Sequence, residues 1–580
     1  MIQRTKQYAT LLKLTQPHHL RLLLRFAVIA LGALHAGAAI ASHSMNADGI
    51  SYLDMGDAYF RGDWQMAVNG VWSPLYAWIL GAALYVIQPS LHWEFAVVHL
   101  VNFLIYLAAL GCFEFFWREV LRSRKQPGTD GERPLMLSEN ALTGLGYALF
   151  TIASLQMIEI WSVTPDLLMS AWVYLAAGLL LQIRRGSATA DTFVRLGAVL
   201  ALGYLSKAVM FPLALVFLGT ALLSLRPLRR SMVLTLPALL AFLLVAGPFI
   251  ALLSARQGKL TYGEAGPLVY ATKVNQITYP HWQGDPPGDG TPVHPSQKVW
   301  DQPPVYEIAG PFHCSYPVSY NPAYWYEGLE VRYQAEKQLQ RLAASGWFYL
   351  KLFWLYFAGL TAGVALLFWL GRGKHGRWLD FFSQRQLLIP PLAAFGLYAL
   401  VLVESRYVGV FLVLLWSELL SNIALPDSWR SRKLLPKISA MMIVFLLFNI
   451  AWFNLQGFLD LRHNGAAPVA EQSAPPASPR EVAQTLHQLG VTPGADVGVI
   501  GYGFDAFWAR LARVHIVAEM FGWEAQPFWQ GDTALQAGVI EAFRHSGARA
   551  IVAERVRETA VPAGWQQVNQ SNYFIYLMDE

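Results

Sequence analysis

Residues 22–42, with the sequence LLLRFAVIALGALHAGAAIAS, decide the fold class. They contain a single charged residue, Arg25, and a run of about 20 apolar residues is long enough to cross a bilayer as a helix. No small-residue cleavage site follows, so we expect an uncleaved anchor rather than a signal peptide. Similar runs predict an all-α membrane domain of eleven transmembrane helices, with the other ten near 93–117, 139–157, 165–183, 193–205, 209–225, 231–254, 347–370, 387–403, 408–424 and 438–457.

The composition agrees with a membrane protein. Of the 580 residues, 55% are hydrophobic and only 14% are charged, whereas a soluble domain has about 25% charged residues. This excludes a soluble enzyme, a disordered chain and a fibrous repeat protein. Two cysteines, Cys112 and Cys314, are too few for a disulfide scaffold or a four-thiolate metal site. The net charge of +5 comes from short basic segments between apolar runs, which is not the single basic face of a nucleic-acid-binding protein.

Those basic segments predict the orientation. If the eleven spans alternate, all of them fall on one side, which the positive-inside rule makes the cytoplasm. The chain is then a multi-pass protein of the cytoplasmic membrane with a cytoplasmic N-terminus. Residues 72–88 would break this pattern as a span, so we expect an interfacial or re-entrant outer helix, with its aromatic residues at headgroup level. The basic segments lie at 4–25, 118–133, 184–195, 226–230, 372–385 and 430–437.

Three large segments, 43–92, 255–346 and about 460–580, then face outward. Residues 461–479 are rich in proline and alanine and predict a linker between a membrane domain, 1–460, and a small extracytoplasmic α/β domain, 480–580. In the latter we expect helices at 480–489, before Ala512 and at 534–546, strands at 496–500, 514–518 and 549–553, and an edge strand at 573–578. Gly501-Tyr-Gly503 follows a strand but lacks the third glycine of a nucleotide-binding loop.

The first outer segment contains four aspartates within residues 48–63. If it is helical, Asp48 and Tyr52 share one face and Asp54 and Asp57 share another. Aspartate is also a common cap and loop residue, and this bland interpretation is preferred for Asp57 and Asp63. Asp48 differs because it lies where a lipid-borne substrate would meet an aqueous one.

This segment resembles the first outer loop of the C-type (GT-C) glycosyltransferases, the superfamily of the protein O-mannosyltransferases and the lipid A aminoarabinose transferase. Their loop often reads Asp-Glu-x-x-Tyr-x-Glu; here Asp48, Tyr52 and Asp54 match, and Gly49 replaces the adjacent Glu. The resemblance continues in layout over about 1–460. It implies a GT-C-like fold, a polyprenyl-phosphate sugar donor and a single catalytic Asp at position 48.

Three short strings sit at expected outer ends of spans, and each has a structural alternative. In Thr164-Pro165-Asp166 the threonine and aspartate suit a helix start. Lys207 closes residues 203–207 at an expected turn and either contacts phosphate or extends to the interface. In Glu404-Ser-Arg406-Tyr407, Arg406 either binds phosphate or pairs with Glu404.

The segment 255–346 is rich in aromatic residues, which either stack on sugars or form a mini-core for a loop with little regular structure. Its histidines, His281, His294 and His313, match no metal-binding spacing.

The resulting hypothesis is an inverting glycosyltransferase with Asp48 as general base. The expected substrate-binding residues are Tyr52, Asp54, Asp166, Lys207, His294, Arg406 and Tyr407. The acceptor is a lipid, a polysaccharide or a protein. No cofactor is required, although Asp48 and Asp54 offer oxygen ligands for a divalent cation. The alternatives are a lipid or solute transporter or flippase, and a membrane scaffold with an outer binding domain. Removal of 466–580 is expected to abolish a scaffold's function but to leave a transferase's chemistry.

Overall fold

The computed structural model is mostly helical, with 68% of the residues that it describes in helices. Parts of the predicted basic segments (1–16, 125–133 and 372–385) and most of the predicted linker lie outside the residues it describes. The described residues are 17–124, 134–186, 189–225, 227–278, 280–371, 386–464, 478–554 and 563–578.

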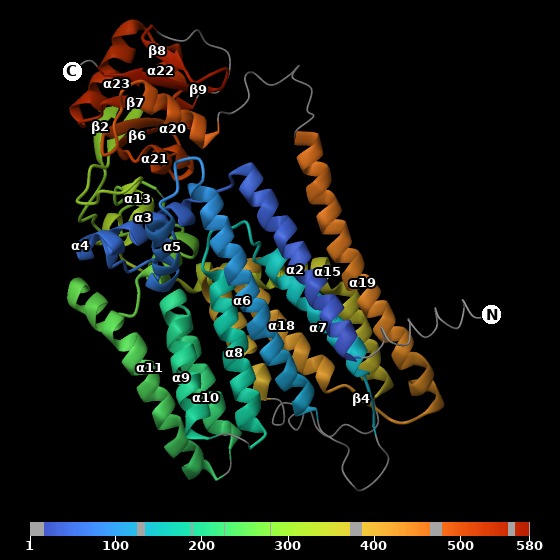
Figure 1. Cartoon of the computed structure of the whole chain (residues 1–580). Helices are drawn as coiled ribbons and strands as arrows, with labels where there is room; N and C mark the ends of the chain where they lie inside the picture. Colours follow the sequence, from blue (N-terminus) through green and yellow to red (C-terminus); the bar gives the residue numbers. More distant parts are fainter. Residues whose placement is uncertain are drawn as a thin grey trace.

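Within the described ranges, six helices are long and apolar enough to cross a membrane, as expected of a multi-pass membrane protein. They stand side by side with the shorter helices in one bundle (Figure 1). Proline interrupts two of them at Pro237, Pro248 and Pro436 without ending the helix. The six are α2 (Pro17–Ser42), α6 (Glu94–Ser123), α8 (Asp166–Arg184), α11 (Leu228–Gln257), α15 (Ala335–Leu370) and α19 (Trp429–Asn464).

Helices also occupy the other five expected positions, but each of these is shorter. The eleven crossings therefore stay a prediction, while the helical nature of all eleven segments is confirmed. The five are α7 (Glu139–Thr151), continued by the π-helix η1 (Ile152–Met157), and α9 (Ala190–Ser206), α10 (Met210–Ser224), α17 (Ile389–Val401), preceded by the 3₁₀ turn η2 (Gln386–Leu388), and α18 (Ser405–Ser421). A two-stranded ladder of β1 (Leu135–Met136) and β4 (Ala424–Leu425) joins two of the connections.

The first outer segment forms a layer between the bundle and the C-terminal domain (Figure 1). It consists of α3 (Ala47–Arg61), α4 (Trp64–Ala67) and α5 (Pro74–Ile87), so 72–88 is helical as expected. Helices α3 and α5 approach closely at two glycines: a Cβ on Gly56 would lie 2.9 Å from the backbone oxygen of Ala77 and 3.0 Å from the Cα of Gly81. Asp63 accepts a hydrogen bond from the Met66 amide at 3.1 Å, which confirms its role as a cap.

The C-terminal domain is an α/β unit around a seven-stranded sheet in the order β2-β3-β6-β5-β7-β9-β8. Its parallel centre is β6 (His515–Phe521), β5 (Asp496–Gly501) and β7 (Ala550–Glu554), which lie where three strands were predicted. The expected edge position of 573–578 is wrong, because β8 (Trp565–Gln567) covers β9 (Tyr573–Leu577). The helices are α20 (Pro479–Gln488), α21 (Phe507–Ala512), α22 (Gln526–Gln530) and α23 (Thr533–His545), with the 3₁₀ turns η3 (Gly503–Asp505) and η4 (Gly522–Glu524).

The second outer segment contributes to this sheet. Its hairpin of β2 (Gln297–Asp301) and β3 (Pro304–Glu307) pairs with β6, where Tyr306 stands opposite Glu519. The expectation of a loop with little regular structure is therefore wrong, and the boundary at residue 480 leaves out two strands of the domain. The same segment also forms the short helices α12 (Ala265–Lys273), α13 (Pro317–Tyr320) and α14 (Pro322–Trp325).

Candidate active site

Asp48, on α3, and Arg406, on α18, meet although 358 residues separate them in sequence. The Arg406 Nη1 atom donates to the Asp48 Oδ2 atom at 3.3 Å. Asp48 lies in the first turn of α3, where the helix dipole favours a carboxylate. The two side chains are 34% and 24% exposed, so both can be reached from outside the protein core.

Arg406 and Tyr407 begin α18. The Arg406 Nε atom also donates to Glu404 at 2.7 Å, so the structural alternative for Arg406, an ion pair with Glu404, is present. The Tyr407 ring stacks on Tyr398 with ring centres 5.2 Å apart. Lys207 also contacts Tyr407: its Nζ atom lies 3.8 Å from the centre of the Tyr407 ring.

Lys207 lies in the turn between α9 and α10, as predicted, and donates to Asp166 at 2.5 Å. Asp166 opens α8 and is almost fully buried. The second oxygen of Asp166 finds no hydrogen-bond partner among the described residues, and neither does the hydroxyl of Thr164. The expected capping role of Thr164 is therefore wrong; Pro165 occupies the cap position.

The cluster brings three carboxylates, Asp48, Asp166 and Glu404, against two cations, Lys207 and Arg406. Burial raises the pKa of the Asp48 carboxyl above its usual value, and the neighbouring Arg406 opposes this. Burial also lowers the pKa of the Lys207 ammonium, while Asp166 opposes that shift. Asp48 is thus a stronger base than an ordinary surface aspartate.

A cavity of about 320 Å³ lies beside this cluster. Its wall includes Arg406, which thereby faces both Asp48 and the cavity, and Glu159, which sequence reasoning missed. Glu159 follows the π-helix η1 and has a left-handed backbone with φ +65°, and such irregular turns are frequent at functional sites. No sequence pattern announces Glu159. The lining residues are Met157, Ile158, Glu159, Ser162, Phe348, Glu404, Ser405 and Arg406.

Tyr52 lies one turn after Asp48 on α3, as the helical spacing predicts. It is buried between the rings of Trp72 and Tyr76, with ring centres 5.4 and 5.0 Å away. Tyr76 in turn donates to Asn102 at 2.6 Å. These contacts fix the helix turn below Asp48.

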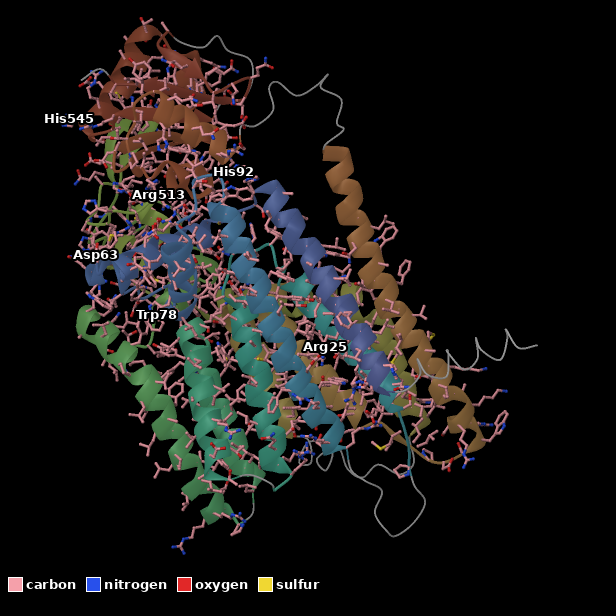
Figure 2. All side chains as sticks on the ribbon, viewed as in Figure 1. Arg25, Asp63, Trp78, His92, Arg513 and His545 are labelled. Carbon is pink, nitrogen blue, oxygen red and sulfur yellow. The ribbon has the colours of Figure 1, made fainter. Side chains whose placement is uncertain are left out.

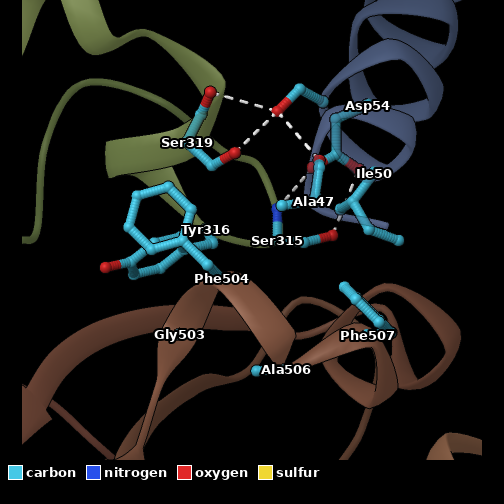
Figure 3. Close-up of a pocket in the computed structure, with 11 residues that line it drawn as sticks. Ala47, Ile50, Asp54, Ser315, Tyr316, Ser319, Gly503, Phe504, Ala506 and Phe507 are labelled. Carbon is cyan, nitrogen blue, oxygen red and sulfur yellow. Dashed lines mark hydrogen bonds between the residues drawn. The ribbon is translucent and has the colours of Figure 1, made fainter. Parts of the chain in front are cut away.

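Asp54 does not join the cluster around Asp48. It accepts hydrogen bonds from the Ser315 amide at 2.8 Å and from the Ser315 hydroxyl at 3.1 Å (Figure 3). It also accepts a hydrogen bond from Arg510 at 2.8 Å. Asp54 thus bonds Ser315 and Arg510, and the shared cation at Asp48 and Asp54 stays a prediction. Within the described ranges, no group of three or more His, Cys, Asp or Glu side chains is arranged to hold a metal.

The prediction for Asp57, also on α3, is wrong. Asp57 pairs with Arg510 at 2.7 Å and with Arg513 at 3.2 Å instead of serving as a cap or solvated loop residue. Arg513 lies at the junction between the C-terminal domain and the outer helices (Figure 2).

His294 lies within the second outer segment. It pairs with Glu327 at 2.9 Å, and its ring stacks on Tyr324 with centres 3.8 Å apart. These contacts do not bring it to Asp48. His281 bonds Ser296 at 2.7 Å and Glu519 at 2.6 Å. This group resembles a hydrolytic triad in composition, but all three side chains are buried, so it ties the outer segment to β6.

The turn Gly501-Tyr-Gly503 is filled by the protein itself. The Gly503 amide donates to the buried Glu519 carboxylate at 2.6 Å. In a phosphate-binding loop, this amide would instead bind the phosphate of a ligand. A Cβ on Gly503 would lie 2.4 Å from the Tyr316 ring, so glycine is needed here for close packing. The nucleotide interpretation is not supported.

No family model and no curated protein matches the chain. Among solved structures, it is similar to ArnT from Cupriavidus metallidurans bound to undecaprenyl phosphate, with 12% identity over 95% of this chain and 97% of that chain and a TM-score of 0.49. It is also similar to the oligosaccharyltransferase of Archaeoglobus fulgidus, with 11% identity over 91% of this chain and 68% of that chain and a TM-score of 0.44.

Proposed function

We propose that the chain is an inverting glycosyltransferase of the cytoplasmic membrane. It moves a sugar from a polyprenyl-phosphate donor to an acceptor hydroxyl on the outer face. The observation that carries this proposal is the meeting of Asp48, Arg406 and Lys207, which come from three distant parts of the sequence, around Tyr407.

Asp48 acts as the general base. It takes the proton of the acceptor hydroxyl while that oxygen attacks the anomeric carbon from the side opposite the phosphate, which inverts the configuration. General-base catalysis of this kind contributes about 10²–10⁴-fold, most when the pKa of the base lies near the working pH. The raised pKa of Asp48 moves it in that direction.

Lys207 and Arg406 stabilise the departing phosphate. Lys207 uses one N–H group on Asp166, and Arg406 has more N–H groups than its contacts with Glu404 and Asp48 use. Because three carboxylates surround these two cations, the phosphate has to displace part of their present contacts. With both cations available, the reaction needs no resident cofactor.

The cavity beside Arg406 suits the donor. Its wall combines Arg406 and Ser405 with apolar side chains, including Phe348 on α15. We propose that the sugar phosphate lies at Arg406 and that the polyprenyl chain continues along the bundle.

The direct test is Asp48→Asn in the purified protein with a labelled polyprenyl-phosphate sugar and a panel of lipid, polysaccharide and peptide acceptors. We expect a normally folded protein that transfers no sugar, since the amide cannot accept the proton. Wild-type transfer should persist in EDTA, and the product should have the inverted anomeric configuration by NMR.

Asp63→Asn is the matched control, because Asp63 lies on the same segment but caps α4. It should keep wild-type transfer. Full activity of Asp48→Asn would remove Asp48 from the mechanism, and movement of the donor across the membrane without any covalent change would favour a transporter.

A further inference from the structure

Helix α21 of the C-terminal domain lies along α3, the helix that carries Asp48. Near the start of both helices, Phe504 and Phe507 face Ala47 and Ile50 across a gap of only about 10 Å³ (Figure 3). Further along, Arg510 faces Asp54. Contacts therefore follow the same order in both helices, from Ala47 to Asp54 on α3.

Arg510 is the centre of this contact. Its side chain is 3% exposed, and its Nη1 atom lies 2.8 Å from Asp54 and 2.7 Å from Asp57, both on α3. Its Nε atom lies 2.7 Å from the carboxylate of Glu94, in the first turn of α6. One guanidinium thus ties α3 to α6 through three carboxylates.

The geometry of this group is specific for arginine. Arg513 adds a second cation at the rim, 2.6 Å from Glu94 and 3.2 Å from Asp57. A planar guanidinium can bond several carboxylates at fixed angles, whereas a lysine ammonium is a compact point charge on a flexible stem. Buried charges that lose their partner are strongly destabilising, so the surrounding carboxylates hold α3 in one place.

The position of α3 in turn sets the position of Asp48. Asp54 follows Asp48 by six residues, which is about 9 Å along a helix. A helix moves largely as a rigid unit. A rotation of α3 at Asp54 would therefore move the Asp48 carboxylate relative to Arg406, which belongs to a different helix.

We propose that Arg510 is a positioning residue for the reaction: through Asp54, Asp57 and Glu94, it holds α3 so that Asp48 faces Arg406. This inference rests on the proposed function of Asp48. The C-terminal domain is then part of the catalytic unit, and the competing interpretation is that Arg510 only stabilises the docking of two domains.

The test uses full-length Arg510→Met and Arg510→Lys in detergent, with Arg544→Met as control. Arg544 is an exposed residue on α23 that pairs only locally, with Glu541. Displacement of a reacting group by about 1 Å can cost on the order of 10²-fold in rate. We expect a loss of that order in kcat for Arg510→Met, a smaller loss for Arg510→Lys, donor KM close to wild type, and no change for Arg544→Met.

A pH profile separates positioning from stability. The charged groups around Asp48 come from three other parts of the bundle. They are Arg406 on α18 with Glu404 just before it, Lys207 just after α9, and Asp166 on α8. If Asp48 moves away from Arg406, the acid limb of kcat should shift to higher pH. A purely structural role would reduce the amount of active protein and leave the limb in place.

Hydrogen exchange gives a readout that does not depend on catalysis. Arg510→Met should exchange faster in peptides of 47–61 while β5 and β7 stay protected. If the wild type transfers no sugar but this exchange pattern appears, the function is wrong and the restraint of α3 by Arg510 stands. Folded Arg510→Met or Arg510→Lys with wild-type kcat, pH profile and exchange in 47–61 would overturn the proposal.

Discussion

Helix α3 has two charged clusters, and they differ in the space beside them. In the cluster at Arg510, both oxygens of Asp54 and both oxygens of Glu94 accept hydrogen bonds, although the Nη2 atom of Arg510 has no partner among the described residues. In the cluster at Asp48, one oxygen of Asp166 likewise has no partner among the residues described. The gap lined by Asp54 measures about 10 Å³, whereas the cavity that adjoins Arg406 measures about 320 Å³. We call the first cluster closed and the second open, because the second has a space next to it that is large enough for a ligand group.

Removal of residues 466–580 is the most severe test of the closed cluster, because it deletes both of its arginines. It takes away Arg510 and Arg513, the cations that pair with Asp54, Asp57 and Glu94. Breaking a buried ion pair costs about 3–5 kcal/mol, and the truncation breaks several. We therefore expect no transfer and little folded protein, measured by size-exclusion chromatography and melting temperature. This reverses the sequence-based expectation that the chemistry survives; an active truncation would show that α3 holds its position unaided.

Arg406→Gln should affect the open cluster alone. Arg406 is 24% exposed, and ion pairs near the surface contribute about 0–1 kcal/mol to stability. Loss of one group that stabilises transition-state charge typically costs about 10²–10³-fold in kcat. We expect a fall of that size with a melting temperature close to wild type, measured on the same preparation. Equal losses of stability in Arg406→Gln and Arg510→Met would abolish the distinction between the clusters.

The two clusters were not equally accessible to sequence reasoning. Helical spacing correctly paired Asp48 with Tyr52 and Asp54 with Asp57, because neighbours on a helix are fixed by its period. The partners of these aspartates on other helices were harder to predict. The motif around Arg406 could be placed at the outer end of a span, but Arg510 lies in a six-residue helix without any distinguishing pattern.

The β2–β3 hairpin escaped prediction for a related reason. Its strands have only four or five residues, and β3, which begins at Pro304, pairs with β6 about 200 residues later in the chain. Local sequence carries little information about such a pairing. For the same reason, the predicted boundary at residue 480 leaves out β2 and β3, which join the sheet from the second outer segment.

Lowering the pH should distinguish the two clusters without any mutation, because the pKa values of Asp48 and Asp57 shift in opposite directions. Burial raises the pKa of Asp48, and its basic form is therefore lost as pH falls while the pH is still above the usual aspartate value of about 3.9. Burial also disfavours the charged form of Asp57, but Arg510 and Arg513 outweigh this and lower its pKa. A lowered folded pKa gives stability that is fully present above the unfolded value and is lost only as pH falls through the folded one.

A pH range should therefore exist above about 3.9 in which the protein is folded and inactive. Within this range we expect kcat to fall about tenfold for each unit of pH below the pKa of Asp48, as for a single titrating base, and to recover fully when neutral pH is restored. Circular dichroism and transfer measured on the same samples test this. Loss of structure in parallel with loss of activity would mean that the two aspartates titrate together, so that the open and closed clusters of α3 are not separate in function.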